Sequence, residues 1–223
     1  MIVLAIDTAG AASTVALADG DTVLWADHAP LTHGHGQVAP VQVETALSAT
    51  GLSARAIDRF GATVGPGSFT GVRVGLALAQ GLARGADRPM VGVTRFALFA
   101  QALAAPVAAD TVMVCLDSRR DAVFAQSFSR KGGGWSPASD PEIKTAQAVA
   151  AQMAGQSGWV VTGDVRDRLL AAGLDPAVWV SIAPTPEALV RCVATTAAPV
   201  PGHRPAPLYL SAPSVTPPAI SAG

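Results

Sequence analysis

Two aspartates stand at matching places in two similar stretches of the chain. Asp7 ends the apolar run 2–6, Asp117 ends the apolar run 111–116, and a short turn of small or polar residues follows each. A carboxylate at the end of a buried strand can hold a metal-bound nucleotide. An aspartate in such a place also commonly caps a turn by accepting hydrogen bonds from backbone amides. The spacing favours turn capping and leaves the nucleotide site open.

The glycine-rich loop GPGSFTG, residues 65–71, is the second candidate for binding chemistry. Its glycines permit close approach, and the helix that follows would offer free N–H groups to an anion. The loop does not match GxxxxGK[ST], because no lysine follows Gly71. The alternative is a tight strand-to-helix connection with Ser68 or Thr70 as the helix N-cap. The weak candidates for ligand binding are therefore Asp7, Gly65, Gly67, Ser68 and Asp117.

Metal and nucleophile chemistry have little support in this sequence. His33 and His35 form an HxH flanked by glycines, whereas two metal ligands on one helical face are usually spaced as HxxxH. Ser68 follows Gly67 directly and does not lie in G-x-S-x-G, and no histidine can be assigned as its base. We therefore expect no metal, no cofactor and no catalytic residue.

The helix expected after the glycine loop carries small residues at a spacing of four. Gly71, Gly75 and Ala79 would leave one stripe of this helix nearly bare, so that another helix can approach closely. That helix could belong to a partner protein or to the same chain, and the two alternatives carry equal weight. The candidates for a partner surface on this helix and the helix at 37–49 are Val38, Val41, Thr45, Gly71, Val72, Gly75, Leu78, Ala79 and Leu82.

The elements that must position these residues repeat once along the chain. Each half reads as a strand ending in aspartate, a turn, a second strand, a hairpin, a third strand and a helix, and the two aspartates are 110 positions apart. This pattern predicts an α/β fold of two similar lobes. The expected parts are an N-terminal lobe at 1–106, a C-terminal lobe at 107–198 and a proline-rich tail at 199–223. The expected strands are 2–6, 13–18, 22–26, 60–64, 91–93, 111–116, 122–128, 159–162 and 178–182, and the expected helices 37–49, 70–84, 95–104, 145–154, 166–172 and 186–197.

The composition indicates a globular protein of the cytoplasm. Half of the 223 residues are hydrophobic and 14% are charged, enough for a sizeable core without disulfides. The formal net charge is -1 and no run of basic residues occurs, so the chain lacks the usual sign of a stand-alone nucleic-acid binder. No secretory signal or membrane span is apparent, and Cys115 and Cys192 suggest buried reduced thiols.

Several motifs together resemble those of the TsaB family, also called YeaZ. The opening IVLAIDT with STVAL resembles the start of these proteins, and GPGSFTGVRVG at 65–75 matches their most specific signature. Asp117-Ser118-Arg119 with Val123-Phe124, and PLYL at 207–210, are similar to two later family motifs. The resemblance covers nearly the whole chain, in the order of the family.

This resemblance implies the duplicated ribonuclease H-like fold of actin and the sugar kinases. It also implies a non-catalytic subunit that pairs with the catalytic subunit TsaD, joined by the ATPase TsaE. TsaD transfers a threonylcarbamoyl group to the adenosine next to the tRNA anticodon. The chain would then form a homodimer when alone and meet tRNA only within the complex. Two other classes stay open, namely a small phosphotransferase using Asp7 and Asp117, and a glycoprotease-like peptidase.

Overall fold

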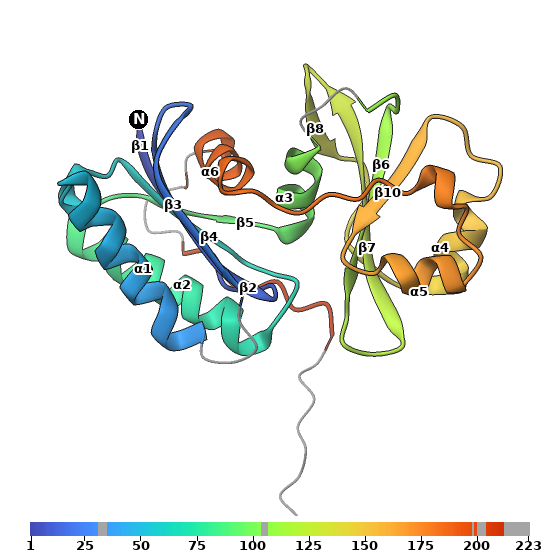
Figure 1. Cartoon of the computed structure of the whole chain (residues 1–223), viewed down its shortest axis with the longest axis horizontal. Helices are drawn as coiled ribbons and strands as arrows, with labels where there is room; N and C mark the ends of the chain where they lie inside the picture. The colour runs from blue at the N-terminus through green and yellow to red at the C-terminus, as the bar shows by residue number, and fades with distance from the viewer. Residues whose placement is uncertain (31–34, 104–106, 198, 200–203, 212–223) are drawn as a thin grey trace, which may run out of the picture.

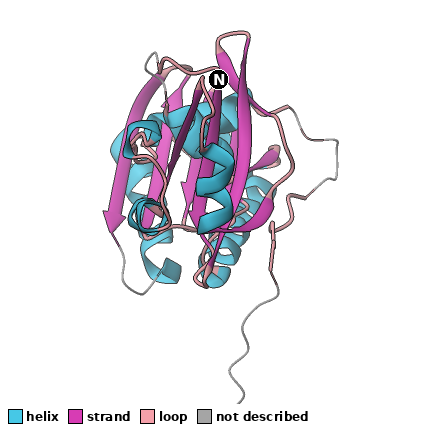
Figure 2. Ribbon diagram, turned by 90° about the vertical axis from the view of Figure 1, so that its right-hand side faces the viewer, coloured by secondary structure: helices cyan, strands magenta, loops and turns pink. Residues whose placement is uncertain are grey.

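The computed structural model describes residues 1–30, 35–103, 107–197, 199 and 204–211, and His33 and His203 lie outside these ranges. The chain forms two lobes side by side, each built on one β-sheet with helices against it (Figure 1). Figure 2, with the second lobe toward the viewer, shows the helices lying against the strands. Within the described residues, no helix is long and apolar enough to cross a membrane.

The first sheet has the strand order β3-β2-β1-β4-β5. Its first three strands pair antiparallel, and the last two run parallel to β1. A hairpin turn suffices for each antiparallel step, whereas each parallel step needs a crossover helix. The strands are β1 (Ile2–Asp7), β2 (Ala12–Asp19), β3 (Thr22–Pro30), β4 (Arg59–Thr63) and β5 (Met90–Val93).

The second sheet repeats this arrangement with the order β10-β6-β7-β8. β6 pairs parallel with β10 and antiparallel with β7, just as β1 pairs with β4 and β2. The two-lobed fold with duplicated topology is therefore confirmed. The strands are β6 (Thr111–Asp117), β7 (Ala122–Lys131), β8 (Gly134–Pro137), β9 (Glu142–Thr145), which pairs with β7, and β10 (Trp159–Gly163).

The helices cover both faces of each sheet. On one face of the first sheet, α1 and α2 pack against Leu4 and Ile6, and on the other face α6 packs against Val3 and Ala5. This division follows from the alternation of side chains along a strand. The helices are α1 (His35–Thr50), α2 (Phe69–Ala86), α3 (Arg95–Ala102), α4 (Ala146–Met153), α5 (Arg166–Ala171) and α6 (Pro186–Thr195), with 3-10 turns at Ala54–Ala56 and Pro176–Val178.

α3 lies between the lobes and contributes to both cores. Leu98 packs into the core shared by the first sheet and α6, while Phe96 and Phe99 pack against the strands of the second sheet. Thr94 caps this helix by accepting a hydrogen bond from the amide of Ala97 at 3.0 Å. The two sheets are therefore joined through one short apolar helix.

The end of the described chain returns to the first lobe. α6 packs on the first sheet although it follows the second in sequence, and a Cβ on Gly61 would lie 2.3 Å from Val193. Residues 204–211 form no helix or strand, yet the amide of Leu208 donates to the carbonyl of Val64 at 2.7 Å. The lobe boundaries at 106 and 198 remain a prediction. Helix α6, expected in the C-terminal lobe, and residues 204–211, expected in the tail, both contact the first lobe.

The expected strand at 178–182 is wrong. A 3-10 turn ends at Val178, and only a single parallel bridge joins Trp179 to Val161 of β10. This bridge stands where the first sheet has β5. Pro176 and Pro184 flank the segment, and proline cannot donate to a strand ladder. The second sheet consequently stops one full strand short of the first.

Candidate functional site

The turn after β1 is organised by Asp7. Asp7 is 7% exposed, and its Oδ1 accepts hydrogen bonds from the amide of Ala9 at 2.9 Å and the hydroxyl of Thr63 at 2.6 Å. Thr63 ends β4, which pairs with β1, so the sheet register brings the two side chains together. The turn-capping alternative for Asp7 is therefore the one that the structure shows.

The glycine loop packs directly on this turn. The amide of Ser68 donates to the carbonyl of Ala9 at 2.8 Å, and the hydroxyl of Thr8 donates to the carbonyl of Gly71 at 2.6 Å. A Cβ on Gly67 would lie 2.2 Å from Ala9 O, and one on Gly71 would lie 1.9 Å from Thr8 O. Both glycines are therefore required by the close approach of the chain to itself.

Ser68 has the capping role that the sequence offered as an alternative. Its side chain accepts from the amide of Gly71 at 3.2 Å as the N-cap of α2. Gly65 has a φ of +106°, which L side chains rarely adopt, and a Cβ built on it would lie 3.1 Å from the carbonyl oxygen of Leu208. The loop is thus a strand-to-helix connection held on both sides by backbone.

Asp117 forms the matching turn in the second lobe with a different environment. It accepts from the amide of Arg119 at 2.9 Å, the same two-residue step as from Asp7 to Ala9. Its side chain is 41% exposed and forms an ion pair with Arg168 of α5 at 3.1 Å. Arg119 adopts a φ of +59°, which completes the turn. Turn capping is again what the structure shows.

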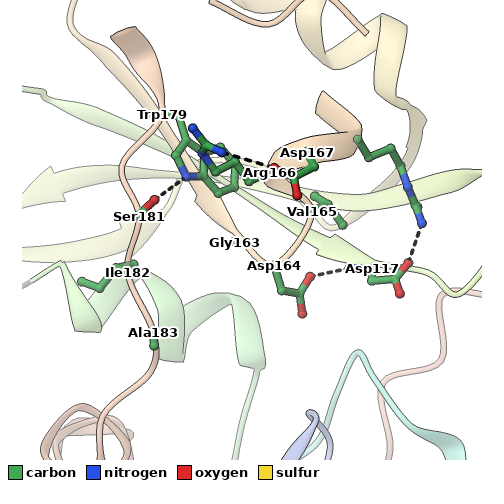
Figure 3. A pocket seen from close by; sticks show the side chains of 11 residues that line it. Asp117, Gly163, Asp164, Val165, Arg166, Asp167, Trp179, Ser181, Ile182 and Ala183 are labelled. Atoms are coloured by element: carbon green, nitrogen blue, oxygen red, sulfur yellow. Dashed lines mark hydrogen bonds and ion pairs between the residues drawn. The ribbon is translucent and has the colours of Figure 1, made fainter. Parts of the chain in front are cut away.

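An ion pair between Arg95 and Asp164 joins the lobes. Arg95 Nη2 lies 3.3 Å from Asp164 Oδ2, and the backbone amide of Arg95 donates to the carbonyl of Gly65 at 2.8 Å. Asp164 follows β10, and its Oδ1 accepts from the amide of Asp117 at 2.7 Å (Figure 3). Gly10, just after the Asp7 turn, lies over the guanidinium, where a Cβ would be 3.1 Å from Nη2.

Neither residue of this ion pair is among the sequence candidates. The signal for Asp164 is its position just after the apolar run 159–162, from which Gly163 separates it, whereas Asp7 and Asp117 follow their runs directly. Nothing in the spacing identifies Arg95, because its importance comes from the meeting of the two lobes.

Two cavities adjoin this ion pair. A cavity of about 600 Å³ is lined by residues of the second lobe that include Asp117, Arg166 and Trp179, whose Nε1 donates to Ser181 Oγ at 3.0 Å (Figure 3). A second cavity of about 330 Å³ lies between the lobes and includes Asp7 and Arg95. The two share the wall formed by Gly163, Asp164, Ile182 and Ala183. Asp7 and Asp117 therefore line different cavities.

The small-residue stripe of α2 faces the chain's own core. Gly71, Val72, Gly75 and Ala79 are buried, and a Cβ on Gly75 would lie 2.5 Å from Thr8 Oγ1. The close approach at this stripe is therefore intramolecular, and these four residues are withdrawn from the candidate partner surface.

The remaining five candidates are exposed or half-buried on α1 and α2, and Leu78 and Leu82 also pack in part against the core of the first lobe. Val41 is 60% exposed, Thr45 is exposed, and Val38, Leu78 and Leu82 are half-buried. Gly81 and Gly85 lie beside Leu78 and Leu82 along α2, and nothing stands within 4 Å of a Cβ built on either. This set, Val38, Val41, Thr45, Leu78 and Leu82 with the two glycines, is called the outer helix face below.

Both cysteines are structural. Cys115 lies in β6 and Cys192 in α6, each free and buried. Burial raises the pKa of each thiol to about 12, because the thiolate would be poorly solvated. Neither thiol is a reactive nucleophile at neutral pH.

The chain is similar to proteins of one tRNA-modification pathway. The family model described as "TsaD: tRNA N6-adenosine threonylcarbamoyltransferase" matches residues 31–162. The tRNA threonylcarbamoyladenosine biosynthesis protein TsaB of Escherichia coli is 36% identical over 165 residues, which cover 73% of this chain and 71% of that protein. TsaB of Bacillus subtilis is 30% identical over 139 residues, covering 60% and 57%.

A solved structure shows the same fold. An uncharacterised protein from Pseudomonas aeruginosa, described as similar to the peptidase YeaZ, superposes with a TM-score of 0.80 at 26% identity. The superposition covers 94% of this chain and 99% of that one.

Proposed function

Because the chain belongs to the TsaB family, we propose that it is the non-catalytic partner of a TsaD-like subunit in forming N6-threonylcarbamoyladenosine on tRNA. The chain has four histidines, at 28, 33, 35 and 203, and no two of them are four positions apart. It therefore lacks the HxxxH that the family resemblance assigns to TsaD. Catalysis belongs to the partner.

The outer helix face carries this proposal. It presents apolar side chains next to two glycines that add no bulk, so a second pair of helices can come close to the backbone of α2. Burial of such a surface gives about 25 cal/mol for each Å² of apolar area removed from water. Val41, with most of its side chain exposed, is the central contact.

The occupant is a TsaD-like chain, which resembles this one. The TsaD family model matches residues 31–162, a range that includes both α1 and α2. A partner with the same helix pair can present a similar surface around a pseudo-two-fold axis, as in isologous interfaces. A second copy of this chain occupies the face when the partner is absent. The TsaE-like ATPase and tRNA join the pair.

The phosphotransferase alternative is not favoured by the site. Asp7 and Asp117 are each held by their own turns, and they line different cavities. The peptidase alternative requires a nucleophile with a base, and Ser68 is committed to the cap of α2. Each alternative therefore lacks the arrangement that its chemistry needs.

The binding test compares two exposed apolar residues. Val41→Glu places a charge on the outer helix face and should weaken association with a TsaD homologue at least tenfold, about 1.4 kcal/mol. Ile143→Glu makes the same change on β9 of the second lobe, where Ile143 is 51% exposed, and should leave affinity within about twofold. Calorimetric titration gives the affinities and circular dichroism shows that both variants fold. Equal affinities would place the interface elsewhere.

The catalytic test uses the purified chain alone. It should not transfer threonylcarbamoyl from its adenylate to tRNA, and adding TsaD and TsaE homologues should give turnover that depends on the chain. Turnover by the chain alone, free of TsaD, would contradict the proposal.

A further inference from the structure

The cavity between the lobes has apolar walls and a small number of polar groups. Its apolar lining includes Leu98 and Phe99 of α3 together with Ile182, Pro184 and Leu189. A volume of about 330 Å³ stands at the lower end of the range for ligand sites, which is roughly 300–1,000 Å³. The cavity therefore suits a small molecule with an apolar part.

Asp7 brings an uncompensated negative charge to this cavity. Both of its hydrogen bonds, from Ala9 and Thr63, go to Oδ1. Within the described ranges, no Lys, Arg or His nitrogen lies close enough to Asp7 for an ion pair. Asp7 as a residue is 7% exposed and lacks a cation, and a largely buried carboxylate without a cation is costly, because the protein interior solvates charge poorly. A bound ammonium group would offset that cost.

Arg95 brings an under-used positive group to the same cavity. Its side chain is 9% exposed, and its buried Nε finds no acceptor. Its two terminal nitrogens share one oxygen of Asp164, at 3.3 and 3.4 Å, and Nη1 also donates to the carbonyl of Pro66 at 3.5 Å. The guanidinium carbon lies 5.5 Å from the centre of the Phe99 ring. Charge-assisted hydrogen bonds of this type are usually about 2.7–2.9 Å, so the pairing is loose. A ligand carboxylate can compete for this guanidinium.

The other polar side chains at the cavity are already paired. The hydroxyl of Thr14 is hydrogen-bonded to Nδ1 of His28 at 2.8 Å, and the hydroxyl of Thr185 accepts from the amide of Ala188 at 3.2 Å. Asp7 and Arg95 are thus the two charged side chains at this cavity that are left to interact with a ligand.

We propose that the cavity binds a free α-amino acid with a small apolar side chain, its ammonium group on Asp7 and its carboxylate on Arg95. A zwitterion matches both charges at once, and its side chain lies against Leu98 and Phe99. A phosphate ester would be repelled by the negative charge of Asp7. A divalent cation prefers several oxygen ligands, and the described residues contain no cluster of three suitable side chains.

The first experiment dissects the zwitterion. The folded chain is titrated with L-valine, with isobutylamine, which lacks the carboxylate, and with 3-methylbutanoate, which lacks the ammonium group. L-valine should bind with a dissociation constant of about 1 mM or lower and at least tenfold more tightly than either fragment. L-threonine, of similar shape, tests tolerance of a hydroxyl. Absence of saturation by L-valine at about 10 mM, or equal binding by one fragment, would overturn the proposal.

The second experiment uses the two lobes as variant and control. Asp7→Asn keeps an oxygen for Ala9 and Thr63 but removes the charge, and it should weaken L-valine binding at least tenfold. Asp117→Asn makes the same change in the matching turn, outside this cavity, and should leave binding unchanged. Thermal unfolding checks that both variants fold. Equal affinity of Asp7→Asn and the wild type for L-valine would contradict the assignment. It would also be contradicted if Mg-ATP displaced L-valine at a concentration below that of L-valine.

Discussion

The two lobes contain the same turn and use it differently. In both, an aspartate at the end of the first strand accepts a hydrogen bond from the amide two residues later, at 2.9 Å. In the first lobe α2 and its glycine loop lie on this turn, so that Asp7 is 7% exposed. In the second lobe the short helix α5 lies beside the turn, and the side chain of Asp117 is 41% exposed.

The difference shows that a local motif does not determine its own tertiary role. The Asp7 turn became a buried packing surface because Gly67, Gly71 and Gly75 allow α2 to approach within backbone contact. The Asp117 turn has no such helix over it and is held by a half-buried ion pair with Arg168. Stability should therefore depend strongly on the first turn and weakly on the second.

The largest effect is expected from Gly75→Leu. The new side chain would begin 2.5 Å from Thr8 Oγ1 and must displace the first turn, at a cost of about 3 kcal/mol or more. Gly81→Leu, in the same helix and with free space around it, should leave the chain folded. Denaturant unfolding followed by circular dichroism measures both. A stable Gly75→Leu protein would show that the first turn is not a rigid packing surface.

A smaller difference is expected between Asp7→Ala and Asp117→Ala. Loss of Asp7 leaves the amide of Ala9 and the hydroxyl of Thr63 without an acceptor in a buried place, which should cost about 2 kcal/mol. Loss of Asp117 removes a half-buried ion pair with Arg168 and an exposed hydrogen bond from the amide of Arg119, and should cost about 1 kcal/mol or less. The free energies of unfolding in urea give the comparison. Equal losses would contradict the asymmetry between the lobes.

The smallest effect is the loss of stability at high pH, to which Cys115 and Cys192 should contribute equally. Cys115 and Cys192 each have a folded-state pKa of about 12, above the ordinary thiol value of 9. Their contribution to stability is therefore complete below pH 9 and is lost as the pH rises toward 12. At pH 10 each thiol should lower the free energy of unfolding by about 1 kcal/mol relative to pH 8. Cys115→Ala and Cys192→Ala should each remove part of this pH dependence, and an unchanged slope would contradict thiol burial as its cause.

The pattern of residues predicts most of the fold. Apolar runs that stop at Asp7 and Asp117 locate β1 and β6, and the repeated order of elements predicts two lobes of one topology. The prediction of a strand at 178–182 is wrong, because this apolar segment lies between two prolines and forms one bridge instead of a ladder of hydrogen bonds. Short apolar runs do not distinguish a strand from an extended connection.

The candidate site is predicted less completely. Asp7 and Ser68 have the local roles that their positions allow, because turn capping and helix capping depend on near neighbours. The direction of the small-residue stripe could not be predicted, since Gly71 and Gly75 would permit close approach of any helix or turn. Arg95 and Asp164 meet across 69 positions, and only the assembled lobes bring them together.

The return of α6 and of residues 204–211 to the first lobe bears on how the protein is made. A ribosome releases the chain from its N-terminus, so β1 to β5 emerge long before Leu189 and Val193, which cover one face of their sheet. During that interval Val3, Ala5 and Val91 are exposed to water and to other chains. The first lobe therefore completes its core only after the second lobe has been synthesised, and the nascent chain has an open apolar surface that a chaperone can protect.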